Sequence, residues 1–381
     1  MKRILILIIS IISISTTVQA ADTALDVMNE QSKNFGINEF IKETGKYSGD
    51  FFEGIDVSNL FTSAVSGKVD NSTLGKKILK LLGSEVSSTI KTLVGILAIV
   101  LIHSILKAVT DNLQGSDVSQ IIYYVQYILI VSLVMTNFAD IIETIKDTVD
   151  NLVGFMNSLV PLLTTLMLFT GSITTTGLIE PILLFIIGFV GNIIANLILP
   201  CVSIITAISI ISKISDKVQI TKISSFMKSS VVWFLGIILT IFVGVLSLEG
   251  TLTSSVDGIS AKTAKAAVSN LIPIVGKILG DSVDSVLGAG LILKNAIGVV
   301  GVIIIIGICI IPVIKLATLT IMYSIASGII EPLADEKIVK LLDEMSGIFK
   351  LLLAILCSVS VLLIIGVTLV IKISNSGMMY R

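Results

Sequence analysis

Apolar runs separated by short polar segments dominate the sequence from residue 92 to the C-terminus. As helices, and with their flanking residues, these runs are long enough to cross a hydrocarbon core about 30 Å thick. The pattern therefore predicts an all-α polytopic integral membrane protein with about seven or eight transmembrane helices. The runs are Thr92–Leu106, Ile121–Ala139, Leu152–Phe169, Leu178–Ile211, Val231–Leu248, Ile297–Met322 and Leu351–Ile371.

The run Leu178–Ile211 decides between those two counts. As one straight helix it would be about 51 Å long, well beyond the thickness of the hydrocarbon core. Pro200 offers a place for a tight hairpin, which gives the higher count, or for a kink in one long span, which gives the lower count. The charges alone do not decide, because the hairpin leaves the basic loop Lys213–Lys228 in the cytoplasm but places the lysines of Lys262–Lys294 outside. We favour the hairpin because the first loop is short and clearly basic, whereas acidic residues balance the charge of the second.

Residues 1–20 have the three parts of a cleavable signal peptide: a basic start, an apolar stretch and a small-residue ending. The basic residues are Lys2 and Arg3, the apolar stretch is Ile4–Ile14, and the ending is Val18-Gln19-Ala20. The apolar stretch is shorter than the roughly 20 residues of a membrane span, which favours cleavage over anchoring. An uncleaved first transmembrane helix is the alternative, and under either hypothesis Ala21 begins outside the cytoplasm.

Changes in composition divide the rest of the chain into four parts. Residues 21–91 are polar, with short amphipathic stretches, and we expect them to form a small extracytoplasmic region. Residues 92–248 hold transmembrane helices, and residues 298–381 hold the C-terminal transmembrane helices. Residues 249–297 are neither a clean span nor an ordinary loop, and we interpret them as an amphipathic or re-entrant, glycine-rich segment.

Three charged residues give this 249–297 segment a candidate functional surface. Lys277, Asp281 and Asp284 recur at i, i+4 and i+7, which places them on one face of a helix. Charges among apolar neighbours are costly unless water or protein matches them, so we expect a partner-facing or conduit-facing surface. A surface helix whose charged face meets water is the alternative. Small residues would also permit close helix packing, at Gly276, Gly280, Gly288 and Gly290.

Composition and charge exclude one class of partner. Of the 381 residues, 54% are hydrophobic and only 14% are charged, so lipid must be the solvent for much of the chain. Lys and Arg number 26 against 27 Asp and Glu. The chain therefore lacks the excess positive charge that nucleic-acid binding requires.

The residues offer no pattern for catalysis, metal binding or cofactor binding. His103 is the only histidine, which excludes a His-pair metal site. Gly276-Lys277-Ile278 does not complete a phosphate-binding loop. We therefore expect a non-enzymatic protein with no cofactor and no metal. The cysteines lie in separate apolar runs and are interpreted as small buried hydrophobes: Cys201, Cys309 and Cys357.

A recognisable series of residues lies within and around the 249–297 segment. It comprises Leu248–Gly258, Lys262-Thr263, Asn270–Lys277, Asp281, Gly288 and Leu293–Gly301. This series resembles the stage III sporulation protein AE family. The similarity extends more diffusely over the order of apolar runs from about residue 92 onward and over the N-terminal signal, whereas residues 21–91 share only composition with the family.

The resemblance implies a function that composition and spacing do not show. It implies a membrane subunit of a trans-envelope channel or secretion-like complex, in the mother-cell membrane that surrounds the engulfed forespore of an endospore-forming bacterium. The implied partners are the other subunits of the sporulation stage III A complex, together with membrane lipid, and a homo-oligomer is compatible with this role. A self-contained permease or secondary transporter is the second hypothesis, since interrupted helices are typical of that class.

Overall fold

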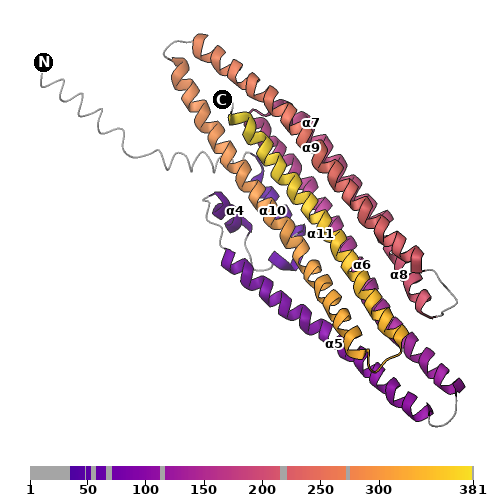
Figure 1. The fold of residues 1–381 in the computed structure, drawn as a ribbon. Helices are drawn as coiled ribbons and strands as arrows, with labels where there is room; N and C mark the ends of the chain where they lie inside the picture. The colour runs from indigo at the N-terminus through magenta and orange to yellow at the C-terminus, as the bar shows by residue number, and fades with distance from the viewer. Residues whose placement is uncertain are drawn as a thin grey trace, which may run out of the picture.

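The structure is a computed structural model that describes residues 35–47, 49–52, 57–65, 71–111, 116–214, 221–271 and 275–379. The signal peptide expected at residues 1–20 lies outside these residues. Within them every regular element is a helix, which confirms the all-α prediction (Figure 1). The elements are α3 (Ile37–Tyr47), the 3-10 turn η1 (Gly49–Phe52), α4 (Val57–Val65), α5 (Asn71–Asp111), α6 (Ser116–Phe169), α7 (Ile173–Ile193), the π-turn η2 (Ile194–Ile198), α8 (Leu199–Ile214), α9 (Thr221–Leu271), α10 (Val275–Ile330) and α11 (Glu336–Met379).

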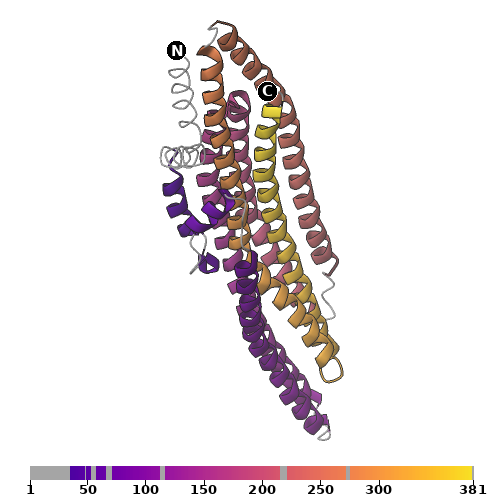
Figure 2. The ribbon, with the colours of Figure 1, turned by 90° about the vertical axis from the view of Figure 1, so that its left-hand side faces the viewer.

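The long helices run side by side and form an elongated bundle (Figures 1 and 2). Helix α6 has 54 residues and α10 has 56. At 1.5 Å per residue these helices are about 81 Å and 84 Å long, more than twice the thickness of a hydrocarbon core of about 30 Å. The bundle is therefore much longer than one hydrocarbon core is thick.

Helices α10 and α11 form the central hairpin of the bundle, and α5, α6 and α9 pack against it. Fully buried side chains fill the contact surfaces, such as Phe155 of α6, Ile304 of α10 and Leu352 of α11. Between apolar helices in lipid, association depends on close van der Waals packing and on small residues. Gly301 of α10 shows this, because a Cβ there would meet the side chain of Leu159 on α6 at 2.7 Å.

Six helical segments are long and apolar enough to cross a membrane in the part of the chain that the structure describes. The expected number was about seven or eight. The lower number arises because α6 joins the runs Ile121–Ala139 and Leu152–Phe169 into one continuous helix. The six segments are Gly75–Leu106, Ile121–Phe169, Ile173–Lys213, Thr221–Gly250, Leu287–Ile330 and Glu336–Ile373.

The hairpin expected within Leu178–Ile211 is wrong, because α7, η2 and α8 form one continuous helical run. Pro200 has no N–H, so it cannot bond to the carbonyl four residues earlier. The π-turn Ile194–Ile198 immediately precedes it, and the N–H of Leu199 bonds to the carbonyl of Ile194. A π-turn is one of the local adjustments that let an apolar helix continue through a proline.

The described residues before α5 pack on the bundle. The ring centroid of Phe40 in α3 lies 6.0 Å from that of Phe155 in α6, and Phe52 of η1 lies directly over Gly307 of α10. Helix α5 is continuous across the domain boundary that we expected near residue 91. The expected 249–297 segment is likewise shared between the end of α9 and the start of α10, on either side of their connection.

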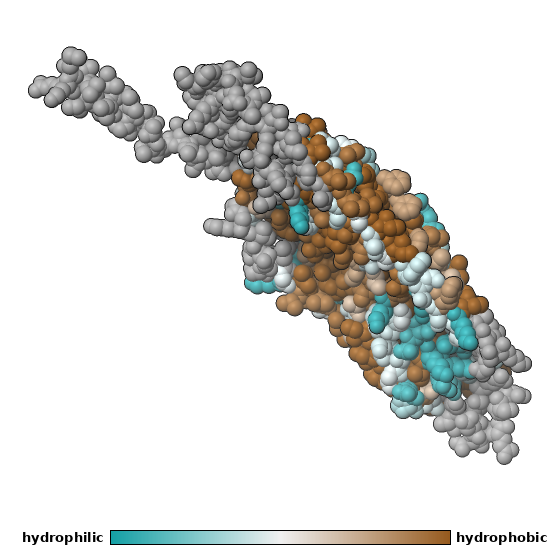
Figure 3. Space-filling view, turned by 45° about the horizontal axis from the view of Figure 1, so that its top comes forward, coloured by the Kyte–Doolittle hydropathy of each residue, from teal (hydrophilic) through white to brown (hydrophobic). Residues whose placement is uncertain are grey.

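Helices α5 and α6 also form a hairpin whose tip projects past the neighbouring helix ends (Figures 1 and 2). The hydroxyl of Tyr127 on α6 donates a hydrogen bond of 2.8 Å to the carbonyl of Ile210, which ties the hairpin to the end of α8. Large apolar side chains are exposed on this hairpin, including Ile102, Ile105 and Ile128. On the face of the molecule that Figure 3 shows, hydrophilic residues gather toward one end and hydrophobic residues cover most of the rest.

Candidate functional site

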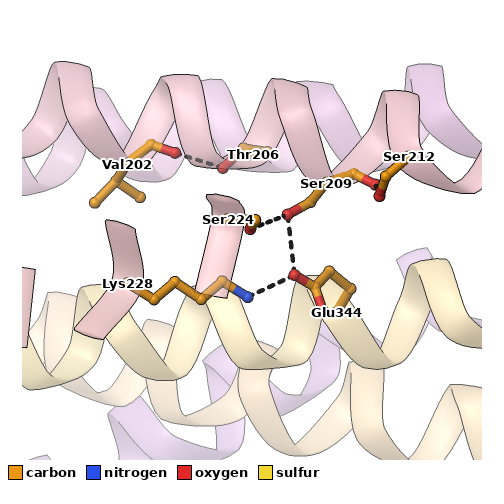
Figure 4. A network of polar contacts seen from close by, with 7 residues as sticks. All are labelled: Val202, Thr206, Ser209, Ser212, Ser224, Lys228 and Glu344. Atoms are coloured by element: carbon orange, nitrogen blue, oxygen red, sulfur yellow. Dashed lines mark hydrogen bonds and ion pairs between the residues drawn. The ribbon is translucent and has the colours of Figure 1, made fainter. Parts of the chain in front are cut away.

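A polar network joins three apolar helices near the end of the bundle where α8 ends and α9 and α11 begin (Figure 4). Nζ of Lys228 on α9 lies 2.6 Å from Oε1 of Glu344 on α11. The hydroxyl of Ser209 on α8 donates to the same oxygen at 2.9 Å. Oγ of Ser209 is also 2.8 Å from Oγ of Ser224 on α9. Because the single Ser209 proton goes to Glu344, Ser224 is the donor in the contact between the two serines.

Glu344 is the acceptor on which this network depends. The Lys228 and Glu344 side chains are 23% and 27% exposed, so solvent screens the ion pair only in part. A charge withdrawn from water is costly unless it is paired and hydrogen-bonded, and ionisable groups on membrane helices are therefore functional candidates. Loss of either partner would leave one uncompensated charge among α8, α9 and α11.

Two further polar contacts join α6 to α10. Nδ2 of Asn137 donates to the hydroxyl of Tyr323 at 2.9 Å. Nζ of Lys315 lies 2.6 Å from Oδ2 of Asp140, whose side chain is well exposed. Asn137 and Asp140 are separated by about 4.5 Å along the helix axis, or almost one turn. The two contacts therefore fix the register of α6 against α10, although the exposed ion pair contributes little free energy by itself.

At the opposite end of the bundle, Asp257 of α9 caps the start of α7. Its Oδ1 accepts a hydrogen bond of 2.9 Å from the N–H of Thr174, and its Oδ2 accepts one of 3.0 Å from the N–H of Thr175. These are two of the N–H groups that a helix start leaves without an intrahelical partner, and a carboxylate there also matches the helix dipole. Asp257 is buried, so the cap fixes α7 against α9.

The arrangement of these groups suits a scaffold of fixed helix register. The hydrogen bonds and ion pairs of Glu344, Asp140 and Asp257 each join two or three helices that are distant in the sequence. Among the described residues, no group of three or more His, Cys, Asp or Glu is placed to hold a metal ion.

The residues that the sequence singled out lie in the first part of α10. Lys277, Asp281 and Asp284 belong to this helix, but their side chains are outside the part that the structure describes. The same holds for Gly276 and Gly280. The partner-facing or conduit-facing surface therefore stays a prediction.

Two glycines of the proposed close-packing set can be located. At Gly290 a Cβ would meet the ring of Phe169 at 2.7 Å and a methyl group of Thr170 at 3.3 Å, so α10 lies close to the end of α6 there. At Gly288 a Cβ would have no neighbour within 4 Å. Small-residue packing by the four glycines as a set stays a prediction.

Sequence reasoning did not identify Glu344, Lys228 or Asp257 as a site. Lys228 was interpreted only as part of a basic loop, and Asp257 only as a residue of the series that resembles a family. Each is an ionisable residue on a long, largely apolar helix, which is the signal that marks such candidates. The pairing between them is not visible in the sequence, because Lys228 and Glu344 are separated by 116 residues.

The fold and these contacts define the class: an all-helical protein whose six long apolar segments fit a multi-pass membrane protein and whose polar side chains join helices. A model of the Stage III sporulation protein AE family matches residues 55–374, and the chain belongs to this family. The Stage III sporulation protein AE of Bacillus subtilis (strain 168) is 29% identical over 306 residues, which cover 80% of this chain and 77% of that protein. No solved structure matches the chain.

Proposed function

We propose that this chain is a non-enzymatic, multi-pass membrane subunit of the trans-envelope channel or secretion-like complex that links mother cell and forespore during endospore formation. The observation that carries the proposal is family membership over residues 55–374, which implies a role in sporulation. The proposed location is the mother-cell membrane around the forespore. The proposed partners are the other subunits of the sporulation stage III A complex, with further copies of the chain compatible with the same role.

The dimensions of the bundle support a subunit that reaches beyond one membrane surface. Helices α6 and α10 have 54 and 56 residues, far more than the roughly 20 residues that cross a hydrocarbon core. The ion pair of Asp140 with Lys315 joins these two helices to each other, and the contacts of Glu344 and Asp257 join α7, α8, α9 and α11. A rigid helical body of this length offers lateral surfaces to partner subunits both within the membrane and next to it.

Copurification tests the proposal directly. The full chain, tagged at its C-terminus, is isolated in mild detergent from cells at the engulfment stage, and the associated proteins are identified by mass spectrometry. We expect the other stage III A subunits at constant ratios to this chain, and not with a tagged, unrelated multi-pass protein from the same cells. Recovery of this chain without these subunits, before and after mild chemical cross-linking, would contradict the channel role.

A self-contained permease or secondary transporter is the second candidate function, and the π-turn is the observation that favours it. The turn Ile194–Ile198 interrupts the regular hydrogen bonding of a long apolar helix, and irregular helices of this kind form binding sites in transporters. Solute uptake by the purified chain alone in sealed vesicles would favour this candidate. Absence of uptake, together with copurified stage III A subunits, would favour the channel subunit.

A further inference from the structure

One exposed face of α6 is charged in the middle of the helix, between its two apolar runs. Four acids recur there at spacings of three or four residues, with one lysine beside them: Asp140, Glu143, Asp147 and Asp150, and Lys146. In the part of the chain that the structure describes, only Asp140 of the four acids is ion-paired, with Lys315 of α10. Like charges at these spacings repel each other, so the three remaining carboxylates require water or an opposite charge around them.

The run of α7 and η2, which packs against α6, exposes apolar side chains at the same height. A Cβ at Gly191 of α7 would meet the side chain of Val153 on α6 at 2.5 Å, so these two residues lie level with each other. The two helices are antiparallel, so Leu197, six residues after Gly191, is about level with Asp147, six residues before Val153. Leu197 is 50% exposed, and Asp147 is exposed as well. Adjacent helices therefore present a leucine and an acid to the outside at one height.

Helix α3 continues the charged surface along the upper part of α6. The ring centroid of Phe35, next to α3, lies 4.8 Å from that of Phe169. At the other end of α3, a Cβ at Gly154 of α6 would meet the ring of Tyr47 at 2.5 Å. Helix α3 therefore covers α6 from about residue 154 to residue 169. Its outward face carries exposed charged side chains: Glu39, Lys42, Glu43 and Lys46.

The charged residues of α6 and of α3 together form a polar side that is taller than a hydrocarbon core is thick. From Asp140 to Phe169, α6 rises by about 44 Å, compared with about 30 Å for the hydrocarbon core. Over nearly the same height, the run of α7 and η2 exposes large apolar side chains by 48% to 69%: Ile173, Phe185, Phe189 and Leu197. One lipid belt cannot suit both sides, because charged side chains are costly in hydrocarbon.

We infer that the polar side faces water at membrane depth, in an aqueous space that the chain encloses with neighbouring subunits, whereas the run of α7 and η2 faces lipid. Close contact with another protein would withdraw three unpaired acids of like charge from water, which is costly. Water solvates them, and their excess negative charge attracts cations into the space. This arrangement requires the membrane location proposed above, but it does not depend on which subunits are the neighbours.

Thiol labelling in native membranes tests this arrangement. Asp147→Cys and the matched control Leu197→Cys are made separately in the full chain without its native cysteines, and membranes of sporulating cells are treated with a cationic, water-soluble methanethiosulfonate. We expect the thiol at position 147 to react at least about tenfold faster than the thiol at position 197, because only the thiolate reacts and hydrocarbon excludes both thiolate and reagent. Both thiols must react in detergent.

The charge of the reagent provides the second measurement. At position 147, we expect the cationic methanethiosulfonate to react about tenfold faster than an anionic one, because a space lined by acids concentrates cations. Removing two neighbouring charges by Glu143→Gln and Asp150→Asn should reduce this preference while the thiol stays accessible.

Two outcomes would overturn the inference. Equal reaction of the thiols at positions 147 and 197 in membranes would place this height outside the hydrocarbon core. Protection of the thiol at position 147 would show that the polar side is covered, and a photoreactive residue at position 143 would then identify the cover as lipid or protein. Copurification of the stage III A subunits is a separate result, so failure of the channel role is distinguishable from failure of this inference.

Discussion

Oε1 of Glu344 accepts hydrogen bonds from two other helices at once, from Lys228 on α9 and from Ser209 on α8. We predict that Glu344→Gln lowers the free energy of unfolding in detergent by about 1.5–3 kcal/mol, the usual range for a hydrogen bond to a charged group. The physical reason is that the ammonium group of Lys228 loses its counter-charge in a partly buried position. Thermal unfolding of the purified chain provides the measurement.

A control variant and a double variant test whether the effect comes from the Lys228–Glu344 ion pair. Glu336→Gln removes an acid from the exposed pair with Lys340 on the same helix, and we expect a change of about 0–1 kcal/mol. The double change Lys228→Met with Glu344→Leu removes both charges, so it should be more stable than Glu344→Gln alone. Equal effects of Glu344→Gln and Glu336→Gln would show that the network does not stabilise the bundle.

The carboxylate of Asp257 caps a helix from a distance of more than 80 residues along the chain. We predict that Asp257→Ala costs about 0.5–2 kcal/mol, as the loss of an N-cap does, and that Asp257→Asn costs less because its amide oxygen still accepts one bond. The local measurement is hydrogen exchange at Thr174 and Thr175, which should become faster. Glu249→Ala, two turns earlier on α9, is the control and should leave exchange at these two amides unchanged.

At the scale of elements, the start of α10 carries the charged face proposed from the sequence. We predict that Asp281→Ala and Asp284→Ala impair sporulation while the protein accumulates normally in the membrane. Loss of Asp281 removes the i+4 partner of Lys277, a contribution of only about 0.2–0.5 kcal/mol on an exposed helix, so folding should persist. Counting heat-resistant spores and immunoblotting of membrane fractions give the two readouts. Wild-type spore counts for both variants would identify this face as ordinary solvated surface.

A second element, the continuous run of α7, η2 and α8, places its two ends on opposite sides of the membrane. The α6–α7 turn and the basic loop after α8 are therefore on different sides, whereas a hairpin would put them on the same side. A hairpin would return the chain to the side from which it started, whereas one continuous helix carries it across. Sequence patterns gave Pro200 as a breaker, and a proline does remove a hydrogen bond. The π-turn before it accommodates the missing bond, so the helix continues. This outcome depends on neighbouring helices and cannot be derived from the local sequence.

At the scale of the whole molecule, the bundle places the α6–α7 turn at one end and the starts of α9 and α11 at the other (Figure 1). We predict that thiols at Ile173 and Ile223, both exposed positions, react with an impermeant reagent from opposite sides of the membrane. A thiol at Leu333 should react from the same side as one at Ile223. The assay uses a background without the native cysteines Cys201, Cys309 and Cys357.

Labelling of Ile173 and Ile223 from the same side would restore the hairpin within residues 178–211 and raise the number of spans from six to seven. Accessibility is controlled by labelling each thiol again after membrane permeabilisation, when both must react. The experiment thus distinguishes two topologies that have the same apolar runs.

The sequence alone determined the class of this protein. Runs of apolar residues this long can satisfy their backbone hydrogen bonds in lipid only as helices, so the all-α architecture follows from local composition. The residue series around Leu248–Gly301 also determined the family, which the match over residues 55–374 shows. Both the class and the family follow from residues that are contiguous in the sequence, so neither requires knowledge of how the helices pack.

Only the tertiary structure decided how the helices are divided and what their polar residues do. Whether two apolar runs form one helix, as in α6, depends on the surface that adjacent helices offer to the polar residues between them. The partners of Glu344 and Asp257 lie far away in the sequence, and side-chain contacts at that range depend on packing. Hydrophobic periodicity specifies that a helix forms, but the register between helices is fixed by contacts that no local pattern contains.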